Sequence, residues 1–278
     1  MNNIQKFFLQ VLKLSLLELI GFVGLLIIIG FILGLIQKSS NKYLFSAFGY
    51  KGILATAWIG TPVHELGHAL MCLAFRHQIT DIRLFILHPT DNTLGYVKHS
   101  YSKQSIYQNV GNFFIGIGPI FSGIGSLFLS LYCLLPNSFK VFQISLNSEI
   151  NTQSLNMIFL EKLVHANFNL IRSIFALSNL TNPYFWVFLI ISIGISSHIA
   201  LSGADIKGAG GGLAALFVII IFITMIGYSI SRNLTSYFSI VTKYYIYVLS
   251  FSMIALLFSS LTLAVSFTLF KLKKAITE

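Results

Sequence analysis

The stretch Thr61-Pro-Val-His-Glu-Leu-Gly-His-Ala-Leu70 places an HExxH motif inside a run of residues apolar enough to lie in a membrane. On a helix, side chains four residues apart share one face, so the imidazoles of His64 and His68 converge as two ligands of a tetrahedral zinc ion would. Glu65 lies beside that point, where it can take a proton from an activated water and return it to a leaving amine. Ionisable residues in an apolar span are costly unless they bind something. The motif therefore predicts zinc catalysis, with a structural or vestigial motif as the alternative.

The composition is that of a membrane protein. Hydrophobic residues make up 55% of the chain and charged residues only 9%, values outside the range of a soluble domain. We therefore expect an all-α polytopic membrane protein whose 278 residues form one integral membrane domain. The net charge of +10 comes from Lys and Arg residues scattered among the loops. This scatter excludes a nucleic-acid site and favours the anionic headgroups of the lipid bilayer as the counterpart.

Six apolar runs are long enough to predict about six transmembrane helices. They lie at about 11–36, 52–75, 110–135, 184–201, 212–230 and 244–270. The first run is too long for the core of a signal peptide, so we expect it to be retained as a span.

Two polar stretches interrupt the apolar runs. The first has β-rich segments at 79–87 and 94–101 on either side of the turn-forming residues 88–93, which predicts a β-hairpin directly after the HExxH helix. The edge of this hairpin either pairs with an unwound substrate chain or is a simple connection. The second, 136–183, has apolar residues at helical spacing over 158–175, which favours an amphipathic segment lying on the membrane surface.

The distribution of positive charge between the two sides of the membrane favours one topology of the chain by a small margin. With the N-terminus in the cytoplasm, ten Lys and Arg residues lie inside and eight outside, and the cluster Lys271, Lys273 and Lys274 follows the last span. We therefore expect both termini and the hairpin on the cytoplasmic side. The small size of the chain favours the membrane of a bacterial cell.

A catalytic zinc ion has three protein ligands, so one ligand remains to be found beyond the HExxH motif. Asp205 is the strongest candidate, because it follows the fourth apolar run among glycines that allow a close approach to another helix. His198 in the same stretch and Glu161 in the polar region 136–183 are the alternatives.

Three further polar residues have weaker claims. His88 and His99 in the predicted hairpin could face the metal, but hairpin histidines are more often solvated. Glu18 in the first run is expected to pair with Lys13, about one helical turn away.

The order of these motifs resembles the site-2 protease family of intramembrane zinc metallopeptidases. The resemblance covers about residues 52–212. It rests on the HExxH motif, the hairpin after it, Gly116-Ile-Gly-Pro-Ile-Phe-Ser-Gly123 on the next span, and Asp205 at the end of a later one. Two positions differ from the family pattern: Ser122 and Gly123 follow Pro119 where Asn is usual, and Ile206 follows Asp205 where Gly is usual.

The resemblance implies His64, His68 and Asp205 as zinc ligands, Glu65 as the catalytic base, and the helices at about 11–36, 212–230 and 244–270 as additions to a three-helix core. The function we expect is an intramembrane zinc metalloendopeptidase that hydrolyses peptide bonds in or near membrane segments of protein or peptide substrates. The alternative is an inactive metal-binding protein or a transporter that binds membrane segments without cleaving them. The sequence fixes neither the substrate nor the oligomeric state.

Overall fold

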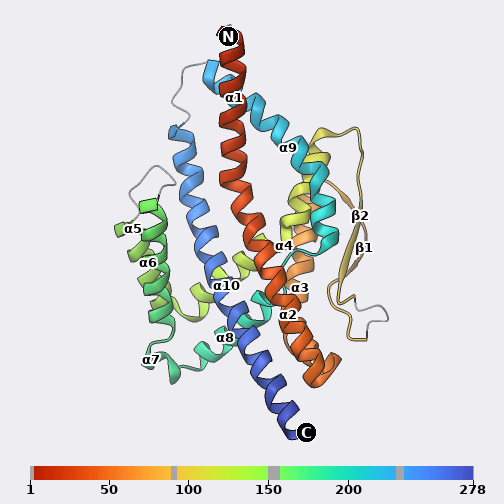
Figure 1. Cartoon of the computed structure of the whole chain (residues 1–278), viewed down its shortest axis with the longest axis vertical. Helices are drawn as coiled ribbons and strands as arrows, with labels where there is room; N and C mark the ends of the chain where they lie inside the picture. Colours follow the sequence, from red (N-terminus) through yellow and green to blue (C-terminus); the bar gives the residue numbers. More distant parts are fainter. Residues whose placement is uncertain (1–2, 89–92, 150–156, 230–234, 278) are drawn as a thin grey trace.

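The computed structural model describes residues 3–88, 93–149, 157–229 and 235–277. Nearly all of them are helical, as expected, and one small antiparallel sheet is present (Figure 1). Many large apolar side chains are exposed. On α9 (Gly203–Ser229), for example, Val218, Phe222 and Ile226 are each more than half exposed and four residues apart. Such a stripe suits contact with lipid, so the chain is a helical membrane protein.

The chain begins with one long helix that a π-helical turn interrupts. The segments are α1 (Asn3–Leu19), η1 (Ile20–Gly24) and α2 (Leu25–Phe48). A π-turn leaves a backbone carbonyl available to another partner, and the hydroxyl of Tyr245 on α10 (Thr235–Thr277) donates to the carbonyl of Gly21 at 3.1 Å. The expected first span at 11–36 therefore lies within a longer helix that ends at Phe48.

Gly49 turns the chain sharply between α2 and α3 (Tyr50–Ala74), the helix that carries the HExxH motif. Its φ of 62° lies in the region that favours glycine. The predicted hairpin follows α3: β1 (Gln78–Arg83) pairs antiparallel with β2 (Tyr96–Ser100), from Gln78 opposite Ser100 to Arg83 opposite Tyr96. The predicted turn at 88–93 lies partly outside the described residues.

The region predicted as a long polar loop is mostly helical. After α4 (Ile106–Leu134) come α5 (Pro136–Glu149), α6 (Met157–Ile174), the short α7 (Leu177–Leu180) and α8 (Pro183–Ser196). The amphipathic helix expected at 158–175 is α6. Its apolar face, including Leu163 and Leu170, is buried in the main hydrophobic core, so this face packs against protein.

Four of the described helices are long and apolar enough to cross a membrane: Leu25–Phe48, Ile106–Leu134, Gly203–Gly227 and Tyr245–Ile276. The segment predicted at 184–201 contains only the 14-residue α8. At 1.5 Å per residue this helix is about 21 Å long, shorter than the hydrocarbon core of about 30 Å. The count of about six spans therefore stays a prediction.

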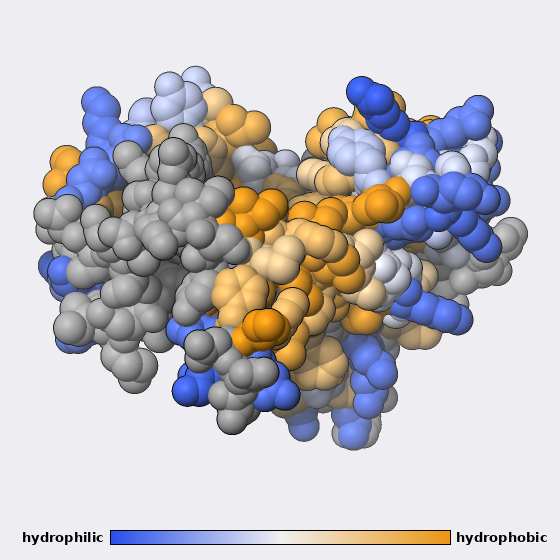
Figure 2. Space-filling view, turned by 90° about the horizontal axis from the view of Figure 1, so that it is seen from above, coloured by the Kyte–Doolittle hydropathy of each residue, from blue (hydrophilic) through white to orange (hydrophobic). Residues whose placement is uncertain are grey.

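The two termini lie at opposite ends of the longest axis of the molecule (Figure 1). The end of α10 lies at the α2–α3 turn, where the Lys273 ammonium donates to the carbonyl of Ala47. The expectation of both termini on one side of the membrane assumed six crossings, and it stays a prediction together with that count. Figure 2, a view onto the N-terminal end, shows apolar residues in the middle of the face and hydrophilic ones toward its sides.

Candidate metal centre

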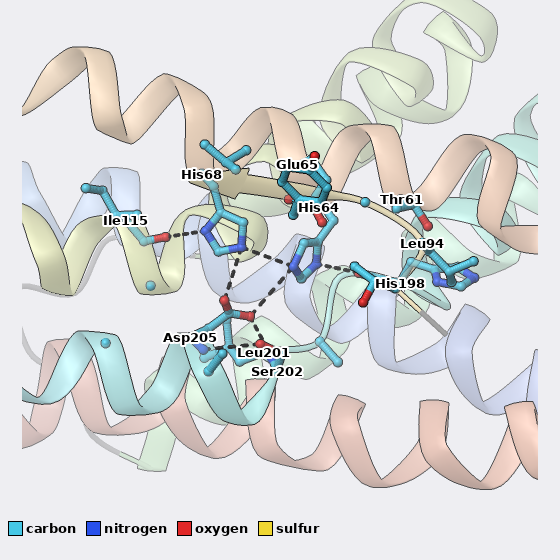
Figure 3. Close-up of a pocket in the computed structure, with 18 of the residues that line it drawn as sticks. Thr61, His64, Glu65, His68, Leu94, Ile115, His198, Leu201, Ser202 and Asp205 are labelled. Atoms are coloured by element: carbon cyan, nitrogen blue, oxygen red, sulfur yellow. Dashed lines mark hydrogen bonds and ion pairs between the residues drawn. The ribbon is translucent and has the colours of Figure 1, made fainter. Parts of the chain in front are cut away.

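Three potential ligands from two helices meet in the structure. His64 and His68 project from α3 toward Asp205 in the first turn of α9 (Figure 3). The two Nε2 atoms are 3.2 Å apart, Asp205 Oδ1 lies 3.2 Å from His68 Nε2, and Oδ2 lies 3.7 Å from His64 Nε2. Among the described residues, this is the group of His, Cys, Asp or Glu side chains positioned to hold a metal ion.

Both imidazoles are oriented by backbone carbonyls. His64 Nδ1 donates to the carbonyl of His198, and His68 Nδ1 donates to the carbonyl of Ile115, each at 2.8 Å. A carbonyl only accepts, so both protons are on Nδ1 and the lone pair of each Nε2 faces the ligand cluster. This second set of contacts is the usual support of metal-binding histidines.

Each of these two carbonyls lacks the helical hydrogen bond that would otherwise engage it. Pro119 has no backbone N–H, so the helical bond to the carbonyl four residues earlier, that of Ile115, is absent from α4. His198 lies two residues beyond Ser196, the last residue of α8, where carbonyls no longer have partners in a following helical turn. The Gly118-Pro119 step thus supplies an acceptor for His68 from within a regular helix.

The carboxylate of Asp205 is held by the start of α9. The backbone N–H of Ser202 donates to Asp205 Oδ2 at 2.7 Å, and the N–H of Asp205 donates to Ser202 Oγ at 3.1 Å. These reciprocal bonds form a capping box, in which the residue before the helix and the third helical residue satisfy each other. The box fixes the backbone position from which Asp205 faces the two histidines.

The arrangement fits a zinc ion. Zinc bonds of 2.0–2.1 Å in a tetrahedron place neighbouring ligand atoms about 3.3 Å apart, close to the 3.2 Å between the two Nε2 atoms. Each oxygen of the Asp205 carboxylate lies beside one imidazole, at 3.2 and 3.7 Å, and one ligand atom from each of the three residues lies within 4.8 Å of the others. Two imidazole nitrogens and one carboxylate oxygen leave a fourth position open, as in catalytic zinc sites. The three residues predicted as metal ligands are thus brought together by the fold.

Close contact between α3 and α4 makes this geometry possible. A Cβ added to Gly67 would lie 2.5 Å from the carbonyl oxygen of Gly118, and one added to Gly118 would lie 2.6 Å from that of Gly67. Beside this contact, Ser122 Oγ donates to the carbonyl of Val63 at 2.7 Å. Ser122, which stands at one of the two positions that differ from the family pattern, therefore joins the two helices.

Glu65, the predicted catalytic base, is buried beside the ligands and faces the same cavity (Figure 3). The hairpin crosses directly over it: a Cβ added to Gly95 would lie 2.8 Å from Glu65 Cγ. The cavity has a volume of about 910 Å³ and is lined by residues of α2, α3, α4, the β2 strand with its preceding loop, and the α8–α9 segment. It is large enough for a peptide segment.

The structure shows where the two alternative third ligands, His198 and Glu161, lie. The His198 ring lies 3.0 Å, Nε2 to Oγ1, from Thr56, so His198 supports the site through its carbonyl. Glu161 is exposed on α6 and does not belong to the cluster.

The structure also shows the positions of the three polar residues that were weaker candidates for a functional role. His88 is exposed. His99 lines the cavity and pairs with His77, whose Nδ1 lies 3.0 Å from its own. Glu18 accepts a hydrogen bond from Thr224 Oγ1 on α9 at 3.0 Å, a partner other than the expected Lys13.

No protein-family model, curated protein or solved structure matches this chain. The resemblance to the site-2 proteases therefore rests on the quoted motifs alone.

Proposed function

We propose that the protein is an intramembrane zinc metalloendopeptidase that cleaves membrane-embedded or membrane-proximal segments of protein or peptide substrates. One observation carries the proposal: His64, His68 and Asp205 each offer a ligand atom within 4.8 Å of the other two, and both imidazoles are fixed with Nε2 facing this cluster. A carboxylate next to this cluster and a peptide-sized cavity in a helical membrane protein are what hydrolysis of a membrane segment requires.

In this proposal His64, His68 and Asp205 hold zinc, which when bound polarises the scissile carbonyl and makes water a nucleophile near neutral pH. Glu65 accepts the proton of the attacking water and delivers it to the leaving nitrogen. No covalent intermediate with the protein forms. The hairpin and α2 complete the walls of the cavity and restrict the entry of bulk water.

The substrate must present an unwound backbone, because the peptide bonds of a membrane helix are already paired within the helix. Polar groups are therefore needed inside the cavity to satisfy the freed N–H and C=O groups. We place the protein as a multi-pass protein of a bacterial cell membrane, with the hairpin on the cytoplasmic side.

The test uses purified protein reconstituted in liposomes with a pool of single-span peptides, and mass spectrometry to detect new termini. Glu65→Gln should retain zinc and lose cleavage, whereas His64→Ala should lose both. Undiminished cleavage by Glu65→Gln would refute the role of that residue. Zinc binding without cleavage by the wild type would favour the alternative, a protein that binds membrane segments and does not cut them.

A further inference from the structure

A polar stripe on α2 faces the candidate metal centre across the cavity. Gly34, Gln37, Lys38 and Asn41 all line the cavity that contains the three ligands and Glu65. Their spacing of three, four and seven residues places them on one face of the helix. These side chains belong to Leu25–Phe48, one of the helices apolar enough to span a membrane.

The polar members of this stripe have no partners in the part of the chain that the structure describes. Among the described residues, no hydrogen bond or ion pair joins the side chain of Gln37, Lys38 or Asn41 to another part of the chain. The carboxylate of Asp205 in the same cavity is already engaged by the two histidines. Polar side chains that line a cavity and have no partner in the protein are available to bind a ligand there.

The other lysines near this end of the molecule differ. Lys42 lies one turn beyond Lys38 and, although both lysines are exposed, does not line the cavity. Lys273 donates to the carbonyl of Ala47 at the α2–α3 turn. Among the described residues, Lys38 is thus the lysine that lines the cavity.

We infer that the α2 stripe is a substrate subsite in which Lys38 binds a carboxylate carried by the substrate within a few residues of the scissile bond. The inference rests on the proposed function. An extended segment lying between α2 and α3 would offer its backbone to the amides of Gln37 and Asn41, each of which both donates and accepts. Lys38 provides a charge-assisted contact, which is stronger than a neutral hydrogen bond.

The carboxylate has two possible sources, an acidic side chain or the C-terminus of a short peptide. The chemistry at Lys38 is the same for both. An acidic side chain would belong to a substrate with Asp or Glu beside the cleavage point. A C-terminal carboxylate would belong to a short peptide that another protease has already released.

The test measures binding of matched peptide hydroxamates to zinc-loaded protein in detergent. The hydroxamate anchors each compound on the metal, and the series carries a C-terminal carboxylate, a C-terminal carboxamide, or an Asp side chain with an amidated end, at one to three residues from the anchor. The proteins are the wild type, Lys38→Gln and the matched control Lys42→Gln. We expect the wild type to bind a carboxylate compound about tenfold more tightly than its carboxamide partner.

Lys38→Gln should abolish this preference while binding the carboxamide compound as the wild type does, and Lys42→Gln should retain the preference. Whether the terminal or the Asp carboxylate shows the effect identifies the source. Equal binding of all compounds by the wild type, or a preference that survives in Lys38→Gln, would overturn the subsite and leave the metal centre intact. Failure of every hydroxamate to bind zinc-loaded wild type would instead remove the proposed function, and the subsite with it.

Discussion

At the scale of single residues, the most informative position is Pro119. It lies four residues after Ile115, and its missing N–H leaves the Ile115 carbonyl free to accept from His68 Nδ1. A proline inside a helix normally lowers stability, so its presence here is explained by the acceptor that it creates.

Pro119→Ala should restore a helical N–H that competes for the Ile115 carbonyl. The expected result is zinc affinity reduced by about tenfold or more, the range found when a second contact to a metal-binding histidine is lost. The metal-free protein should unfold at the same or a higher temperature, because the helix gains a bond. Competition with a chelator measures the affinity.

Pro62→Ala in α3 is the matched control, because the carbonyl four residues earlier belongs to Trp58, which contacts neither imidazole. Unchanged zinc affinity in Pro119→Ala would show that the Ile115 contact does not orient His68.

At the scale of elements, the approach of α3 to α4 sets the position of the HExxH motif. Gly67→Ala should force these helices apart, because the new Cβ would lie 2.5 Å from both the Gly118 carbonyl oxygen and Ser122 Oγ. We expect a loss of about 1–3 kcal/mol in the free energy of unfolding, typical of overpacking, together with weaker zinc binding.

Gly125→Ala on α4 is the control, since a Cβ there has no neighbour within 4 Å. It should be neutral or stabilise the helix by up to about 1 kcal/mol. Thermal unfolding in detergent compares the two variants, and equal melting temperatures would contradict the close-contact account.

The hairpin should respond to pH through His99. Burial lowers the pKa of the His99 imidazole below its usual value, and the nearby His77 and His68 lower it further. A lowered pKa means that the folded hairpin binds the proton more weakly than the unfolded chain does. Stability is therefore complete above pH of about 6.5 and decreases as the pH falls through the folded pKa.

Hydrogen exchange of β1 and β2, corrected for intrinsic rates, measures this effect. His99→Gln should remove the pH dependence, whereas His88→Gln, at an exposed position, should keep it. Protection that is constant from pH 8 to pH 5 in the wild type would show that His99 does not couple to the hairpin.

At the scale of the whole molecule, the path of the chain sets which side each terminus faces. The termini lie at opposite ends of the longest axis (Figure 1), so we expect Ile4→Cys and Ile276→Cys to be labelled from opposite sides of a vesicle. Ile4 and Ile276 are 67% and 84% exposed. Both variants would be made in a protein whose own cysteines, Cys72 and Cys133, have been replaced, so that only the introduced cysteine reacts. Labelling of both from one side would instead agree with the six-crossing prediction made from the sequence.

The sequence predicts the parts of the molecule that depend on local pattern. The HExxH spacing, the hairpin signal after it and the apolar period of α6 all correspond to observed elements, and Asp205 lies where a third ligand was sought. The extent of α2 was missed because hydropathy ends at Lys38 while the helix continues to Phe48. Helix α5 was missed because its polar residues suggested a loop, whereas the helix at α6 was predicted.

Two features of the site could have been predicted from patterns in the sequence. Ser202-Gly-Ala-Asp205 has the spacing of a capping box, which predicts a helix beginning at Gly203 with Asp205 in its first turn. Pro119 within an apolar run predicts a free carbonyl at Ile115. Nothing local could indicate that these two features meet His64 and His68, because that depends on the packing of α4 against α3, α8 and α9.

The most direct test of the account is the zinc content of folded, detergent-purified wild type, Asp205→Ala and Glu161→Gln, each confirmed to elute as a single species. We predict about one zinc per chain in the wild type and in Glu161→Gln, and a strong loss in Asp205→Ala. Zinc retained by Asp205→Ala, or lost from Glu161→Gln, would contradict the three-ligand centre.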